Sequence, residues 1–175
     1  MKHLYFIRHG LSEGNVKEVW SGTTDTPLHK VGRAQARAAG RKAKKLNIDL
    51  IVSSPLSRAK ETAGIIAGAI NYPKSKIMYS DLLIERHWGD AEGTPHSLEV
   101  DLETVPNIES ADALLARAKE ALDFLESLES ESILVVSHGS FGRALRHYLL
   151  EDMPFVNKPS SPQHKIPNAE IIQWI

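Results

Sequence analysis

Three short segments of the chain place basic side chains directly after apolar runs, and two of them also contain a glycine. They are Arg-His-Gly at 8–10, Ser-Ser-Pro-Leu-Ser-Arg at 53–58 and Ser-His-Gly-Ser at 137–140. In the second segment we expect Ser54 to cap a helix that begins at Pro55, and the third also precedes a helix. Arginine binds phosphate oxygens in pairs, and helix N-termini add backbone N–H donors, so these groups suit a phosphoryl anion. Glycine after each histidine lets the backbone approach such a ligand closely.

The apolar runs before these segments are expected to be strands. Residues 4–7, 48–53 and 133–137 are continuous and rich in β-branched residues, which is typical of strands buried on both faces of a parallel sheet. Residues 170–175 could add an edge strand. Between the runs lie helical patterns with one apolar face. The four faces comprise Ala36, Ala39, Ala43 and Leu46; Leu56, Ala59, Ala63, Ile66 and Ile70; Leu114, Leu115, Ala118, Leu122 and Leu125; and Phe141, Leu145 and Tyr148.

The alternation of strands and helices predicts an α/β fold. We expect three layers, an open and mostly parallel sheet with helices on both faces, and a single domain over residues 1–175. Ligands of such sheets bind beyond the carboxyl ends of the strands. Arg8, His9, Arg58 and His138 are therefore predicted to meet at one edge of the sheet. Two segments, 89–107 and 154–167, are expected to be irregular loops.

Composition excludes several classes of protein. The formal net charge of −1 gives no overall attraction to nucleic acid or to an anionic membrane. There is no cysteine, hence no disulfide, thiolate metal site or cysteine nucleophile. No stretch approaches the roughly 20 apolar residues that span a bilayer, and the N-terminal apolar run is too short for a signal peptide. We expect a cytoplasmic protein, and the sequence leaves the oligomeric state open.

The remaining histidines do not have the spacing of a metal site. They are scattered, without an HxxxH-type pair, and no acidic cluster resembles a magnesium site. We therefore expect no metal and no cofactor. The six histidines outside the motifs are His3, His29, His87, His96, His147 and His164.

Five segments in order along the chain resemble those of the histidine phosphatases, also called the phosphoglycerate mutase-like superfamily. They are RHGLSEGN (8–15), GTTDTPLHKVGRAQA (22–36), SSPLSRAKETA (53–63), LLIERHWGDAEG (82–93) and VVSHGS (135–140). One matching triplet would be weak support, but five in order cover nearly the whole chain. The resemblance implies a phosphoglycerate mutase-like fold.

The resemblance also implies a role for each matched residue. His9 would attack phosphorus to form a phosphohistidine, and Glu85 would protonate the leaving oxygen and then activate water. The phosphoryl group would be held by Arg8, Asn15, Arg58, His138 and Gly139. An imidazole attacks only when neutral, and neighbouring arginines favour that form.

The sequence favours a phosphatase over a phosphoglycerate mutase. A mutase must hold the carboxylate and second phosphate of its substrate, whereas residues 89–110 contain no lysine or arginine and are acidic at Glu92, Glu99, Asp101, Glu103 and Glu109. Basic residues in the C-terminal part, Lys158, His164 and Lys165, would weaken that argument if they fold back. The expected substrate is a small phosphomonoester, with a phosphoprotein as an alternative. A mutase-type phosphotransferase and a catalytically silent phosphate-binding module remain the other hypotheses.

Overall fold

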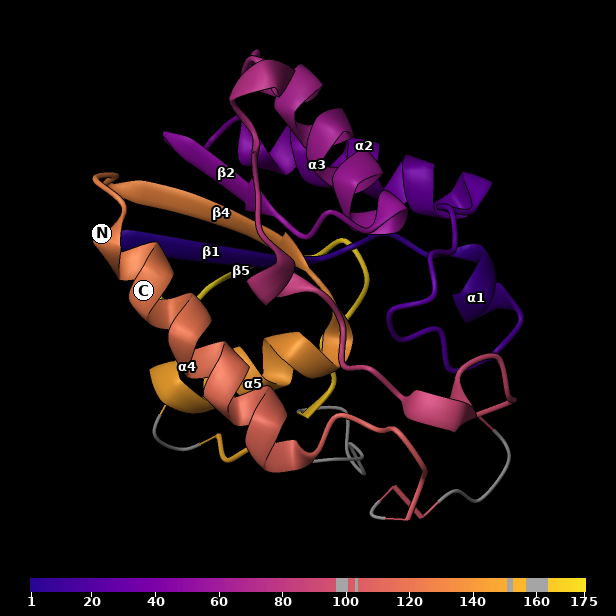
Figure 1. The fold of residues 1–175 in the computed structure, drawn as a ribbon. Helices are drawn as coiled ribbons and strands as arrows, with labels where there is room; N and C mark the ends of the chain where they lie inside the picture. The colour runs from indigo at the N-terminus through magenta and orange to yellow at the C-terminus, as the bar shows by residue number, and fades with distance from the viewer. Residues whose placement is uncertain (97–100, 103, 151–152, 157–163) are drawn as a thin grey trace.

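The computed structural model describes residues 1–96, 101–102, 104–150, 153–156 and 164–175. Its strands form one five-stranded sheet in the order β3-β2-β4-β1-β5 (Figure 1). The strands are β1 (His3–Arg8), β2 (Leu50–Ser53), β3 (Met78–Tyr79), β4 (Ser132–Ser137) and β5 (Ile171–Gln173). The first four are parallel and β5 is antiparallel at the edge beside β1. The sheet is therefore open and mostly parallel, as predicted.

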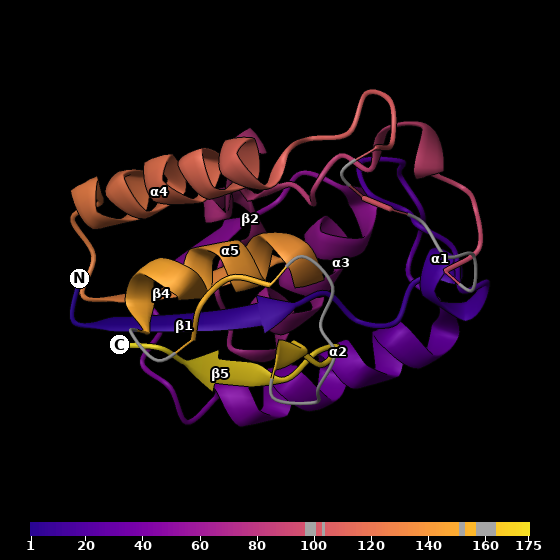
Figure 2. The same ribbon diagram turned by 90° about the horizontal axis from the view of Figure 1, so that it is seen from below.

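Helices cover both faces of this sheet (Figures 1 and 2). The α-helices are α1 (Glu13–Val16), α2 (Lys30–Ala43), α3 (Ser57–Ala69), α4 (Ala111–Ser127) and α5 (Gly139–Leu149), and the 3₁₀ helices are η1 (Lys74–Lys76), η2 (Asp81–Leu83) and η3 (Gly89–Ala91). Helices α2 and α3 pack against one face, and α4 and α5 against the other. The three-layer α/β prediction is confirmed. In the described part of the chain, none of the helices is long and apolar enough to cross a membrane.

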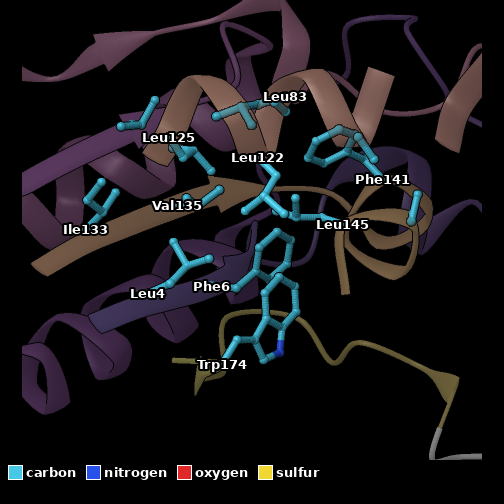
Figure 3. Close-up of a cluster of buried hydrophobic side chains, with 14 of the residues drawn as sticks. Leu4, Phe6, Leu83, Leu122, Leu125, Ile133, Val135, Phe141, Leu145 and Trp174 are labelled. Atoms are coloured by element: carbon cyan, nitrogen blue, oxygen red, sulfur yellow. The ribbon is translucent and has the colours of Figure 1, made fainter. Parts of the chain in front are cut away.

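Alternation along β1 divides its side chains between the two cores. Leu4 and Phe6 join the core beneath α4 and α5, whereas Tyr5 and Ile7 join the core beneath α2 and α3. Successive side chains of a strand point to opposite faces, so a strand covered on both sides needs apolar residues at every position. Figure 3 shows the first core, where Phe6 stacks on Trp174 with ring centroids 4.3 Å apart.

Three local expectations differ from the structure. Helix α3 begins at Ser57, with Leu56 as N-cap, and not at Pro55. The Ser54 hydroxyl lies within hydrogen-bond distance of a buried histidine and accepts only a long bond from Leu56 N (3.3 Å), so it caps no helix. Tyr148 is exposed and does not belong to the core face of α5. The sequence pattern also missed the two-residue strand β3.

Two glycines on helices provide a test of this packing. A Cβ on Gly142 in α5 would lie 2.5 Å from Phe6 Cζ, so Gly142→Ala should lower the free energy of unfolding by about 1–3 kcal/mol. On the exposed side of α3, a Cβ on Gly68 would meet nothing closer than 3.8 Å, so Gly68→Ala should raise it by about 0.4–1 kcal/mol. Urea unfolding of both variants measures the difference, and a stabilising Gly142→Ala would contradict the packing described.

Candidate active site

The carboxyl ends of the central strands open onto a cavity of about 350 Å³. In the parallel pairing of β1 with β4, Arg8 lies opposite Ser137, so the residues that follow, His9 and His138, emerge side by side. Arg58 reaches the same place from the first turn of α3. The cavity is lined by Arg8, His9, Asn15, Val19, Trp20, Ser21, Gly22, Arg58, Glu85, Trp88, His96, Gly139, Ser140, Arg143, Lys165 and Ile166.

His9 is buried and oriented by its own loop. Its Nδ1 lies 2.7 Å from the carbonyl oxygen of Gly10. Because a carbonyl oxygen can only accept, Nδ1 carries the proton and Nε2 of the neutral ring is bare. The N–H of Gly10 in turn donates to Thr62 Oγ1 (3.1 Å), which fixes the loop. Burial, and then the charges of Arg8 and Arg58, hold the pKa of His9 well below its ordinary 6.5. His9 is thus a neutral imidazole at neutral pH.

His138 lies directly behind His9. The two rings are 5.1 Å apart, edge to face, and the side chain of His138 is completely buried and does not itself line the cavity. Its Nε2 lies 2.8 Å from Ser54 Oγ, whereas its Nδ1 is buried without a hydrogen-bond partner in the described residues. Burial, and then the charge of Arg58, lower the pKa of His138 well below its ordinary value, so this ring is neutral too.

The two predicted arginines are held by backbone carbonyl groups. Arg58 donates from Nη2 to Gly22 O (2.6 Å) and from Nη1 to Thr24 O (3.0 Å), and it is 1% exposed. Arg8 donates from Nη1 to Ile166 O (3.0 Å), and its buried Nε has no partner in the described residues. Burial lowers the pKa of both guanidinium groups, but arginine is so basic that both stay charged near neutral pH.

Glu85 is held at the N-terminus of α5. Its Oε1 accepts hydrogen bonds from the backbone N–H groups of Arg86 (2.9 Å), Ser140 (3.1 Å) and Phe141 (2.9 Å). Among the described residues, its Oε2 shares only the N–H of Ser140. Glu85 lies in the cavity with His9.

Asn15 and Gly139 complete the predicted set. Both line the cavity. The Oδ1 of Asn15 accepts from the backbone N–H of Ser12 (3.1 Å), closing a capping box around α1. From the C-terminal segment, Asn168 donates to the carbonyl oxygen of His9 (2.8 Å) and lies 3.5 Å from Asn15 Oδ1. Every residue of the predicted site is therefore in or directly behind one cavity.

The sequence did not point to several lining residues. Arg143 lies one turn after Gly139 on α5, and its Nη2 donates to Ser140 Oγ (2.8 Å). Burial lowers its pKa to about 10. Arg143 follows Gly139 by four residues, and this spacing places both on the same side of α5. The prediction for this helix used only its apolar face. Trp20 had no such signal, because it comes from a loop whose course the pattern does not predict. Lys165 was named only as a basic residue that could fold back, and it does line the cavity.

Two carboxylates of the acidic segment, Glu92 and Glu109, are held by partners in the protein and do not line the cavity. Glu92 is bound inward, because its carboxylate accepts from the backbone and hydroxyl groups of Thr23 and Thr24 and from Trp88 N. Glu109 forms an ion pair with Arg117 (2.8 Å). Two further residues named in that argument, Glu99 and Glu103, lie outside the described residues, as does Lys158.

Lys165 and Arg143 line the cavity, which makes it more cationic than the sequence suggested. The charge argument against a mutase is correspondingly weaker. Among the described residues, no group of three His, Asp or Glu side chains has the arrangement of a metal site.

Fold and site together define an α/β protein with a cationic, histidine-bearing cavity at the carboxyl edge of its sheet. The sequence model of the histidine phosphatase superfamily (branch 1) matches residues 4–173. The chain belongs to that superfamily.

Related proteins include phosphatases and mutases. The chain is 35% identical over 149 residues to the uncharacterized phosphatase PhoE of Bacillus subtilis, covering 83% of this chain and 76% of that protein. It is 41% identical over 92 residues to a 2,3-bisphosphoglycerate-dependent phosphoglycerate mutase of a Methylobacterium species, which covers 51% of this chain and 44% of the mutase.

Solved structures agree in fold over almost the entire chain. YhfR of Bacillus stearothermophilus superimposes with a TM-score of 0.85 at 28% identity, covering 99% of this chain and 90% of that one. A mycobacterial glucosyl-3-phosphoglycerate phosphatase in complex with VO3 superimposes with a TM-score of 0.78 at 27% identity, covering 99% and 92%. The predicted phosphoglycerate mutase-like fold is confirmed.

Glu92 offers a test of how the site is held. Its carboxylate fixes Thr23 and Thr24, and the loop that carries them supplies the carbonyl groups that hold Arg58. The amide of glutamine has only one oxygen, so Glu92→Gln leaves part of this set without an acceptor. We expect kcat/KM for para-nitrophenyl phosphate to fall about 10- to 100-fold through misplacement of Arg58.

Substrates with different leaving groups distinguish a positioning role of Glu92 from proton transfer by its carboxylate. A positioning residue should cause equal losses on para-nitrophenyl phosphate and on an alkyl phosphate, whereas an acid should cause a larger loss on the alkyl ester. Glu126→Gln, at an exposed position of α4, is the control and should keep full activity. Unequal losses would make Glu92 an acid.

The two buried histidines predict a loss of stability in mild acid. The unfolded chain protonates them near pH 6.5, but the folded protein does so only at much lower pH, because both pKa values are lowered. The unfolded state therefore binds more protons below pH 6.5, and the free energy of unfolding should fall by about 1.4 kcal/mol per pH unit for each histidine.

Urea unfolding between pH 5 and 8 measures this effect. In His138→Asn, the free energy of unfolding should fall less steeply below pH 6.5, because one titrating histidine fewer contributes to its pH dependence. His29→Asn is the control, since asparagine can also cap α2 at that partly exposed position. Equal slopes in His138→Asn and the unchanged protein would show that His138 is already protonated in the folded state.

Proposed function

We propose that the protein hydrolyses phosphomonoesters through a phosphohistidine intermediate on His9, with residues 1–175 acting as one domain. The observation that carries this proposal is the state of His9. Its Nδ1 is committed to Gly10 O, its Nε2 is bare, and its low pKa keeps the ring neutral beside two arginines. A neutral, oriented imidazole is what attack on phosphorus requires.

Arg8, Arg58 and His138 would hold the phosphoryl oxygens. Two buried atoms of this set, Arg8 Nε and His138 Nδ1, have no protein partner among the described residues. Buried polar atoms are normally hydrogen-bonded, and a phosphoryl oxygen would satisfy both. If the Ser54 hydroxyl donates to His138 Nε2, the proton of the neutral ring lies on Nδ1, where it can be donated to the ligand. Asn15 and Gly139 line the same cavity and would complete the binding site for the phosphoryl group.

Glu85 would act as general acid and then as general base. Three N–H groups hold its Oε1, so the less committed Oε2 is the atom able to give a proton to the leaving oxygen. The same atom can later take a proton from the water that attacks the phosphohistidine. Positive charge from two arginines can stabilise the transition state without a metal or other cofactor.

The expected substrate is a small phosphorylated metabolite in the cytoplasm. The relatives that share the greater part of the chain include proteins named as phosphatases. A mutase-type transfer remains the second candidate, because Arg143 and Lys165 add positive charge to the cavity.

A trapping experiment tests the intermediate. With para-nitrophenyl phosphate in the presence of a chelator, rapid quenching should yield about one phosphate per chain, stable to alkali and labile to acid, and located on His9. His9→Ala should abolish both the label and turnover while circular dichroism and thermal unfolding show an intact fold. Label on another residue, or turnover that requires added metal, would refute this mechanism.

A further inference from the structure

The cavity is larger than its phosphoryl-binding groups require. Its volume of about 350 Å³ lies in the range of pockets that enclose a whole small molecule. One part of its lining is polar and is formed by the histidine, arginines and glutamate already described. Another part is formed by Val19, Trp20, Trp88 and His96, and is called the aromatic wall below.

The aromatic wall is fastened by backbone hydrogen bonds. Trp20 N donates to Thr94 O (3.0 Å), Gly93 N donates to Trp20 O (2.8 Å) and His96 N donates to Glu18 O (2.7 Å). Val19 and Pro95 are paired in the same antiparallel bridge. This short ladder joins the loop after α1 to the segment after η3, so the wall is formed before any ligand binds.

Ring contacts fix Trp20 within the wall. Its centroid lies 4.5 Å from that of Trp88 and 4.6 Å from that of His96, in tilted and edge-to-face arrangements. Trp88 is only 4% exposed and is held further by the guanidinium of Arg86, 4.9 Å from its ring. Trp20 keeps more exposed surface than Trp88 and lines the cavity, so it is the ring available to a ligand.

The wall carries no charge that would select a charged leaving group. Burial lowers the pKa of His96, which favours its neutral form, and Glu85 is the single carboxylate among the described lining residues. Trp88 follows Glu85 by three residues, so the wall adjoins the carboxylate that is expected to protonate the leaving oxygen. The cationic Arg143 and Lys165 come instead from α5 and the C-terminal segment.

We propose that the physiological substrate is a phosphomonoester whose leaving group carries an aromatic ring, which stacks on Trp20. Flat apolar rings pack on an indole face in offset or edge-to-face geometry. This inference rests on the proposed function, because it names the substrate class of the same cavity.

Two alkyl phosphates of similar leaving-group basicity test it. Naphthylmethyl phosphate offers a ring and propyl phosphate does not, although both release a primary alkoxide. We expect naphthylmethyl phosphate to be preferred in kcat/KM. Trp20→Leu should lower kcat/KM for it by about five- to tenfold, mainly through KM, and change that for propyl phosphate less than twofold. Trp20→Phe should restore most of the preference, and Tyr148→Leu, an exposed aromatic position outside the cavity, is the matched control.

Binding provides a readout that does not need turnover. Naphthylmethylphosphonate, which cannot be hydrolysed, should bind the unchanged protein more tightly than propylphosphonate in calorimetry, and Trp20→Leu should remove the difference. If the phosphonates show this pattern while no ester is hydrolysed, the inference stands and the proposed hydrolysis fails. If both esters are hydrolysed and Trp20→Leu alters them equally, hydrolysis stands and the inference is overturned. Preference for a phosphorylated hydroxy acid, lost in Lys165→Met, would also overturn it.

Discussion

The hydrogen bonds between the central strands continue past the ends of those strands. His9 N donates to Ser137 O (2.9 Å), and Ser54 N donates to Val136 O (3.0 Å), so β4 fixes the first residues beyond both of its neighbours. The ring of His138, which directly follows β4, then lies between them, 5.1 Å from His9 and 2.8 Å from the Ser54 hydroxyl. A shift of register by one residue in either pairing would turn these side chains toward the opposite face and dismantle the site.

Burial and charge together determine the chemistry available there. Desolvation makes a charged imidazole unfavourable, and two guanidinium groups make it more so, hence both histidines are neutral. The guanidinium groups themselves remain charged because backbone carbonyl groups solvate them in place of water, from Gly22 and Thr24 for Arg58 and from Ile166 for Arg8. The cavity thus keeps the charged guanidinium groups beside a neutral imidazole, and burial maintains that neutral form below the pH at which a free histidine would be protonated.

The sequence predicts the sheet, its layers and the residues at its carboxyl edge, because these follow from local patterns. Continuous apolar runs identify buried strands, and parallel strands must end at one edge, which brings Arg8, His9 and His138 together. The rest of the cavity depends on contacts between distant loops. Tertiary packing brings Glu92 onto Thr23 and Thr24. It also brings Trp20 against Trp88 and His96. No periodicity in the sequence encodes such contacts. The role of Glu85 came from resemblance, since by itself a carboxylate beside an arginine favours a surface position.

The position of β1 in the sheet has a consequence for synthesis on the ribosome. This strand leaves the exit tunnel well before its neighbours β4 and β5, which begin at Ser132 and Ile171. Arg8 and the carbonyl oxygen of His9 also receive their contacts from Ile166 and Asn168. Until those residues emerge, the nascent chain carries an apolar strand with two unpaired edges. The candidate site is thus assembled only after the segment that carries Ile166 and Asn168 has been translated.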